Sequence, residues 1–147
     1  MKSLPANRDK METCCLIIQC KTEEAIKQPM KACYRGIHEE SGLTAEEIEG
    51  LKLRYVLLRV KEEEVRQQFV YFGEARTREV TASEEGELHW IHQNELPSLP
   101  MSRIIRFMLE HCDAHPDNPT ITVGVISRDC DGNPDIQWSV LQDPGVF

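Results

Sequence analysis

Arg35-Gly36-Ile37-His38-Glu39-Glu40-Ser41-Gly42-Leu43 is the stretch around which this chain is organised, and it predicts the end of a short helix. Gly42 suits the left-handed residue that closes a helix. Glu39 and Glu40 follow Gly36 by three and four positions, which places all three on one side of that helix. Two adjacent carboxylates repel each other, and a hard divalent cation such as Mg²⁺ would relieve the repulsion. On composition alone, two adjacent glutamates on a helix more often belong to a solvent-exposed face than to a metal site.

The whole pattern is more specific than the two glutamates alone. It resembles the second half of the Nudix box, G-x5-E-x7-R-E-U-x-E-E-x-G-U, where U is apolar. The matching positions are Arg35, Ile37, Glu39, Glu40, Gly42 and Leu43. The resemblance is to the Nudix family and its MutT-like hydrolases. It implies an α+β fold, specifically a Nudix-type α/β/α sandwich with a mixed sheet.

The first half of the box departs from the family pattern. The box glycine would fall at Lys21 and its first glutamate at Lys27. Gly36 stands where the box has a glutamate that, in the family, binds metal and helps to activate the attacking water. The connector 21–28 contains no glycine, whereas the family has a glycine-rich loop near the phosphates. The chain therefore resembles a Nudix protein with a degenerate box.

The resemblance implies hydrolysis, dependent on Mg²⁺ or Mn²⁺, of a nucleoside diphosphate linked to a group X. Glu39 and Glu40 would be catalytic metal ligands, and Arg35 would orient them by a charge-assisted hydrogen bond. Glu85, in the acidic turn 83–87, is the first choice for a further metal ligand. A second hypothesis stays open: a Nudix-fold module that binds a nucleotide or a protein without turnover. The aromatic residues expected near the pocket are Tyr55, Phe69, Tyr71 and Trp90.

Length and composition indicate one globular domain, residues 1–147, with a core at 12–113 and a hairpin at 119–142. The net charge of −8 argues against a nucleic-acid duplex as partner. No apolar run approaches the roughly 18 residues that a membrane span needs. Because the N-terminus lacks an apolar signal core, we expect a cytoplasmic protein. The cysteines form no C-x-x-C pair, so we expect free thiols.

Hydrophobic patterning predicts the remaining elements. We expect strands over 13–20, 51–60, 65–72, 75–80 and 88–91, a capping-box turn over 44–47, and a helix from Ser102 to Cys112. Segments 120–126 and 136–141 predict a terminal hairpin. Only one strand precedes the box, so the sheet is shortened at the N-terminus, and the hairpin could extend it. An unpaired sheet edge invites a second copy, which makes a homodimer an expectation.

Two other groupings of possible ligands predict no metal site. The alternating acidic residues in 129–135 lack the glycine and glutamate positions of an EF-hand, so a hairpin turn is the better interpretation. His111, Cys112 and His115 lack a second ligand pair. Histidines at a helix end, where a positive charge interacts favourably with the helix dipole, are the better interpretation of that segment.

Overall fold

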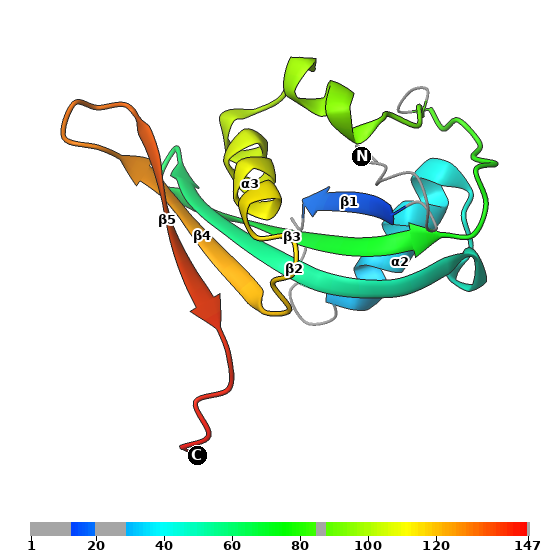
Figure 1. The fold of residues 1–147 in the computed structure, drawn as a ribbon, viewed down its shortest axis with the longest axis horizontal. Helices are drawn as coiled ribbons and strands as arrows, with labels where there is room; N and C mark the ends of the chain where they lie inside the picture. Colours follow the sequence, from blue (N-terminus) through cyan, green and yellow to red (C-terminus); the bar gives the residue numbers. More distant parts are fainter. Residues whose placement is uncertain (1–12, 20–28, 85–87, 147) are drawn as a thin grey trace.

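The computed structural model describes residues 13–19, 29–84 and 88–146, and Figure 1 shows their fold. Its strands are β1 (Thr13–Gln19), β2 (Ile48–Lys61), β3 (Glu64–Ala75), β4 (Ile121–Arg128) and β5 (Pro134–Leu141). Its α-helices are α2 (Pro29–Ser41) and α3 (Arg103–Ala114). Short 3₁₀ turns, η1 (Ala45–Glu47) and η2 (Gln93–Ser98), lie before β2 and before α3. The predicted α+β class is confirmed.

The strands form one mixed sheet in the order β1-β3-β2-β4-β5. β3 pairs antiparallel with both β1 and β2, and β4 pairs antiparallel with β5. The β2–β4 contact is parallel. The predicted C-terminal hairpin is therefore present, and it extends the sheet beyond β2. Within the described residues, one strand precedes α2, and the C-terminal hairpin supplies two further strands of the sheet.

Irregularities in β2 decide which side chains face which helix. Leu53 lies opposite Tyr71, but Tyr55 lies opposite Val70, so one extra residue of β2 is inserted between the two pairs. Such a bulge reverses the alternation of side chains along the strand. Leu53 and Tyr71 therefore face one side of the sheet, and Tyr55 and Val70 face the other. A second shift lies near Gly50, whose φ of +62° is readily adopted by glycine.

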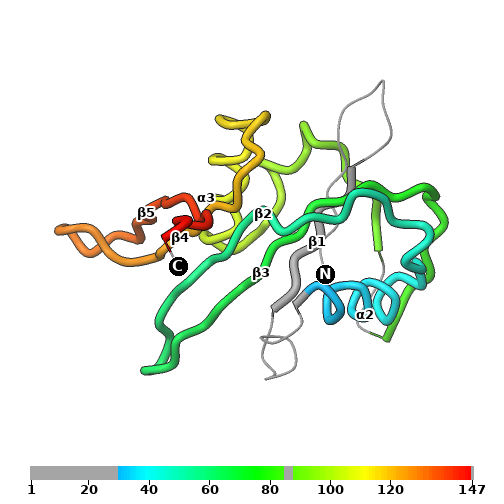
Figure 2. Tube along the Cα trace, turned by 90° about the horizontal axis from the view of Figure 1, so that it is seen from below, coloured from blue at the N-terminus to red at the C-terminus, as the bar shows by residue number. Residues whose placement is uncertain are grey.

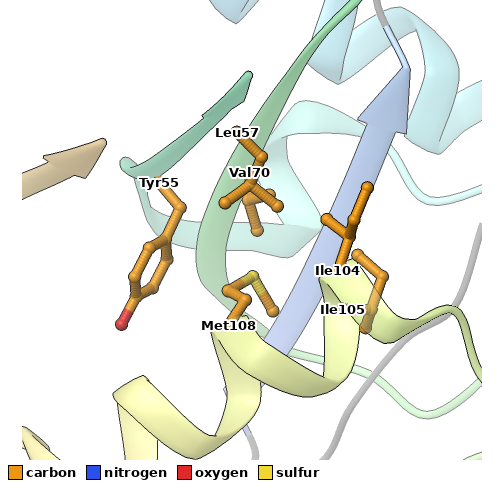
Figure 3. Packing of buried hydrophobic residues seen from close by; sticks show 6 residues of the cluster. All are labelled: Tyr55, Leu57, Val70, Ile104, Ile105 and Met108. Atoms are coloured by element: carbon orange, nitrogen blue, oxygen red, sulfur yellow. The ribbon is translucent and has the colours of Figure 1, made fainter. Parts of the chain in front are cut away.

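Each face of the sheet carries a helix and an apolar cluster. Figure 2 shows strands β2 and β3 passing between α2 and α3. The cluster under α2 contains Cys33, Ile37, Leu43, Ile48, Leu51 and Tyr71. The cluster under α3 contains Tyr55, Leu57, Val70, Ile104, Ile105 and Met108, whose side chains face one another in Figure 3. The layers are therefore helix, sheet and helix.

Two predicted short strands are not strands in the structure. β3 already ends at Ala75, and residues 77–80 and 88–91 form loops. The backbone of this segment bonds elsewhere: Arg76 N–H donates to the carbonyl oxygen of Glu47 over 2.8 Å. Alternating apolar residues form a strand only when a neighbouring strand supplies a ladder of hydrogen bonds. The pattern of residues 75–80 lacks that neighbour within the described ranges.

Other expectations from the sequence concern single residues. Thr44 N–H donates to Glu47 Oε2 over 2.9 Å, so the predicted capping turn before β2 is confirmed. Cys112 and Cys130 are free thiols, as expected. Among the helices in the described part of the chain, none combines the length and the apolar character that crossing a bilayer requires.

Candidate functional site

Helix α2 ends where the sequence predicts. Gly42 has a φ of +75°, and its N–H donates to the carbonyl oxygen of His38 over 2.9 Å. One left-handed residue with this backbone bond is a common way to close a helix. The buried hydroxyl of Ser41 donates to the carbonyl oxygen of Ile37 and accepts from Leu43 N–H. The closing turn of α2 is thus held by hydrogen bonds from both backbone and side chain.

The predicted metal ligands lie on this turn in different surroundings. The Glu39 side chain is 67% exposed, and its Oε1 lies 3.9 Å from Arg35 Nε. A pair so exposed stabilises the fold little, but it keeps Arg35 within ion-pair reach of one carboxylate. Glu40 is partly buried, as is Gly36 one turn earlier. Successive helix residues point about 100° apart. Glu39 therefore lies on the exposed side of α2, and Glu40 lies next to the buried side.

A distant loop is attached to the same turn. Thr81 N–H donates to the carbonyl oxygen of Ser41 over 2.8 Å. A Cβ atom built on Gly42 would lie 3.2 Å from Thr81 Oγ1, so the loop passes close to the end of the helix. Glu84, three residues further on, opens the acidic segment and is exposed. Glu85, the predicted third ligand, lies outside the described residues.

The metal-binding capacity of the turn can be judged from its donors. Within residues 13–19, 29–84 and 88–146, no three or more His, Cys, Asp or Glu side chains are grouped so that they could hold a metal ion. Glu39 and Glu40 supply two carboxylates. Mg²⁺ is commonly bound by one or two carboxylates together with water and substrate phosphates. The chemistry of this pair therefore fits a cation whose coordination is completed by substrate.

The sheet separates the aromatic residues that were expected near one pocket. Phe69 and Tyr71 belong to the cluster under α2. Tyr55 belongs to the cluster under α3, so its expected place beside the α2 site is wrong. The bulge in β2 causes this, because it turns Tyr55 to the other face. Trp90 Nε1 donates to the carbonyl oxygen of Arg78 over 2.8 Å, which ties Trp90 to the loop after β3.

A second cluster, which the sequence revealed only in part, lies on the α3 face. The Tyr55 hydroxyl oxygen is 3.0 Å from His111 Nδ1. The His111 ring stacks on that of His115, with centroids 4.4 Å apart, and its centroid lies 4.4 Å from that of Trp138. Burial lowers the pKa of His111, and the nearby charge of His115 lowers it further. The lowered pKa favours the neutral form of His111, and the cluster links α3 to β2 and β5.

Part of this second cluster has a sequence signal. His111 and His115 are four residues apart, the spacing of neighbours on one helix face. Their meeting with Tyr55 and Trp138 depends on the pairing of β4 with both β2 and β5, which no local pattern specifies.

Comparisons with known proteins do not identify the site. No protein-family model matches the chain, and no curated protein or solved structure matches it at a significant level. The functional assignment therefore rests on the residues of the α2 turn and on the loop that contacts it.

Proposed function

We propose that the protein is a Nudix-type hydrolase, dependent on Mg²⁺ or Mn²⁺, that cleaves the diphosphate of a nucleoside diphosphate linked to X. The bond from Thr81 N–H to the Ser41 carbonyl oxygen is the observation that carries this proposal. It holds the loop leading into the acidic segment 83–87 against the turn that bears Glu39 and Glu40. This contact supports the proposal that carboxylates from two distant parts of the chain contribute to one site, as the resemblance implies.

Each residue has a distinct role in this proposal. Glu39, Glu40 and Glu85 would hold the cation. When bound, the cation would neutralise phosphate charge and lower the pKa of a coordinated water. Arg35, within ion-pair reach of Glu39, would keep that carboxylate oriented. Glu40 is half-buried whereas Glu39 is exposed, so we take Glu40 as the stronger candidate for a fixed ligand.

Gly36 lowers the expected rate and favours a second candidate function. The residue stands where the Nudix box has a glutamate that helps to activate water. Losing a general base typically costs about 10²- to 10⁴-fold in rate. The alternative is a catalytically degenerate module that binds a nucleotide or a protein partner through the same turn. The glycine-free connector 21–28 favours this alternative as well.

The proposal is tested by the release of phosphate or pyrophosphate from a panel of nucleoside diphosphate derivatives, with and without Mg²⁺. We expect slow release that requires the cation and that Glu40→Gln abolishes. Glu46→Gln, which removes an exposed glutamate from the neighbouring turn η1, is the matched control and should leave the rate unchanged. Release that needs no cation, or that survives Glu40→Gln, would contradict the assignment.

Gly36→Glu separates the enzyme from the binding module. If the wild type turns over no substrate but Gly36→Glu gains Mg²⁺-dependent release, the site is a degenerate one. If the wild type already releases product, Gly36→Glu should accelerate it by about 10²-fold or more. No activity in either protein, together with no nucleotide binding, would remove the hydrolase and the nucleotide-binding module and leave only a protein-binding module.

A further inference from the structure

The β2–β3 hairpin carries two arginines that face each other. Arg59 and Arg66 are directly opposite in the antiparallel pair, so their side chains leave the sheet on the same face. Like charges in that position repel, and the pair lowers stability unless something compensates it. The juxtaposition therefore calls for a physical explanation.

Both arginines also have buried hydrogen-bond donors without an acceptor. The Nε atoms of Arg54, Arg59 and Arg66 are inaccessible to solvent and have no hydrogen-bond partner among the described residues, and of these three arginines only Arg59 and Arg66 lie opposite each other. An unmade buried donor costs more free energy than an average hydrogen bond contributes. Arg66 Nη2 lies 3.2 Å from Glu64 Oε2, but the Glu64 side chain is 71% exposed. No carboxylate in the described ranges pairs with Arg59.

One further cation and one carboxylate lie next to the pair on the same face. Lys61 lies opposite Glu64, two residues further towards the turn, and shares the face of Arg59 and Arg66. This face of the hairpin thus presents three cationic side chains and one carboxylate. Along β2 it continues the row that holds Leu57, which belongs to the cluster under α3. It is therefore the face opposite α2, and it is separate from the turn that bears Glu39 and Glu40.

We propose that Arg59 and Arg66 form a binding site for the phosphoryl group of a small molecule. A guanidinium presents Nε–H and a terminal N–H as a fork that matches two oxygens of a phosphoryl group. A dianion between the two arginines cancels their repulsion and gives both Nε donors an acceptor once each guanidinium turns outward. Binding of the dianion thus relieves both the repulsion and the unmet Nε donors of the free protein.

The test is titration of the full chain with inorganic phosphate at constant ionic strength, without divalent cations, followed by NMR or calorimetry. We expect saturable binding that Arg59→Gln and Arg66→Gln each weaken about tenfold or more. Arg59→Lys should keep part of the affinity, because lysine supplies charge but no fork. Arg128→Gln, which removes an exposed arginine of β4, is the matched control and should bind like the wild type.

Thermal unfolding distinguishes a binding role from a structural one. Without phosphate, Arg59→Gln should keep or raise the Tm, because it removes the repulsion and one orphaned donor. Phosphate should raise the Tm of the wild type but not of that variant. Three results would each overturn the proposal: no saturable binding by the wild type, equal weakening in Arg128→Gln, or a large fall in the Tm of Arg59→Gln. Because Glu40→Gln should bind phosphate normally, this test is independent of the proposed hydrolase activity.

Discussion

The turn between β2 and β3 offers a direct test of how backbone strain limits the stability of this fold. Glu62 and Glu63 form a two-residue loop between Lys61 and Glu64, with φ values of +51° and +67°. Two consecutive left-handed residues define the type I′ hairpin turn, which strongly prefers Asn-Gly. A left-handed backbone conformation costs an ordinary residue about 1–2 kcal/mol, so the two glutamates lower the stability of the folded state.

Replacing Glu62-Glu63 by Asn-Gly should therefore stabilise the protein. Glycine at position 63 removes about 1–2 kcal/mol of strain, and asparagine at position 62 removes part of a similar amount. The greater freedom of glycine in the unfolded chain takes back about 0.5–1 kcal/mol. We expect a net gain of about 1 kcal/mol, which raises the Tm of a domain of this size by about 2–4 °C. Thermal unfolding followed by circular dichroism measures the change.

The control for this substitution is Glu62→Gln combined with Glu63→Gln. This variant removes the same two charges but keeps two residues that resist left-handed backbone. It should stay within about 0.5 kcal/mol of the wild type, as most surface substitutions do. An equal gain in the glutamine variant would show that charge repulsion, and not backbone strain, limits the turn. A loss of stability in the Asn-Gly variant would refute the reasoning altogether.

Three further predictions follow from packing, protonation and the sheet edge. In Gly124→Ala the new Cβ would lie 2.6 Å from Trp138 Cζ3, so we expect a loss of about 1–3 kcal/mol in chemical denaturation. His111 has a lowered pKa in the folded state, so the unfolded state binds more protons once the pH falls below about 6.5. Unfolding free energy should therefore drop from pH 7.5 to pH 5.5, and less so in His111→Asn; an equal drop in both would contradict this. If the outer edge of β5 pairs with a second copy, Val140→Lys should convert a dimer to a monomer in light scattering, whereas Val60→Lys should not.

The local part of the structure follows from the order of residues. The closing glycine of α2, the capping turn at Thr44 and the terminal hairpin depend on groups within a few positions of one another. The strands predicted over 75–80 and 88–91 are wrong because an alternating pattern cannot show whether a neighbouring strand exists. The expected pocket position of Tyr55 is wrong because a bulge in β2 reverses the side-chain alternation, and the sequence does not mark where pairing slips.

The candidate site divides in the same way. Arg35, Glu39 and Glu40 can be named from the sequence, since their spacing on one helix is a local property. The contact of Thr81 with the end of α2, and the opposition of Arg59 and Arg66, join residues that only the folded chain brings together.

Sequence alone thus determined where this chain turns, caps and ends its helices, because those features depend on the conformational preferences of neighbouring residues. Tertiary structure alone decided the strand order, the faces of the sheet and the contacts across it. The physical reason is that hydrogen bonding and burial between distant segments select one pairing and register among several that the same local preferences allow.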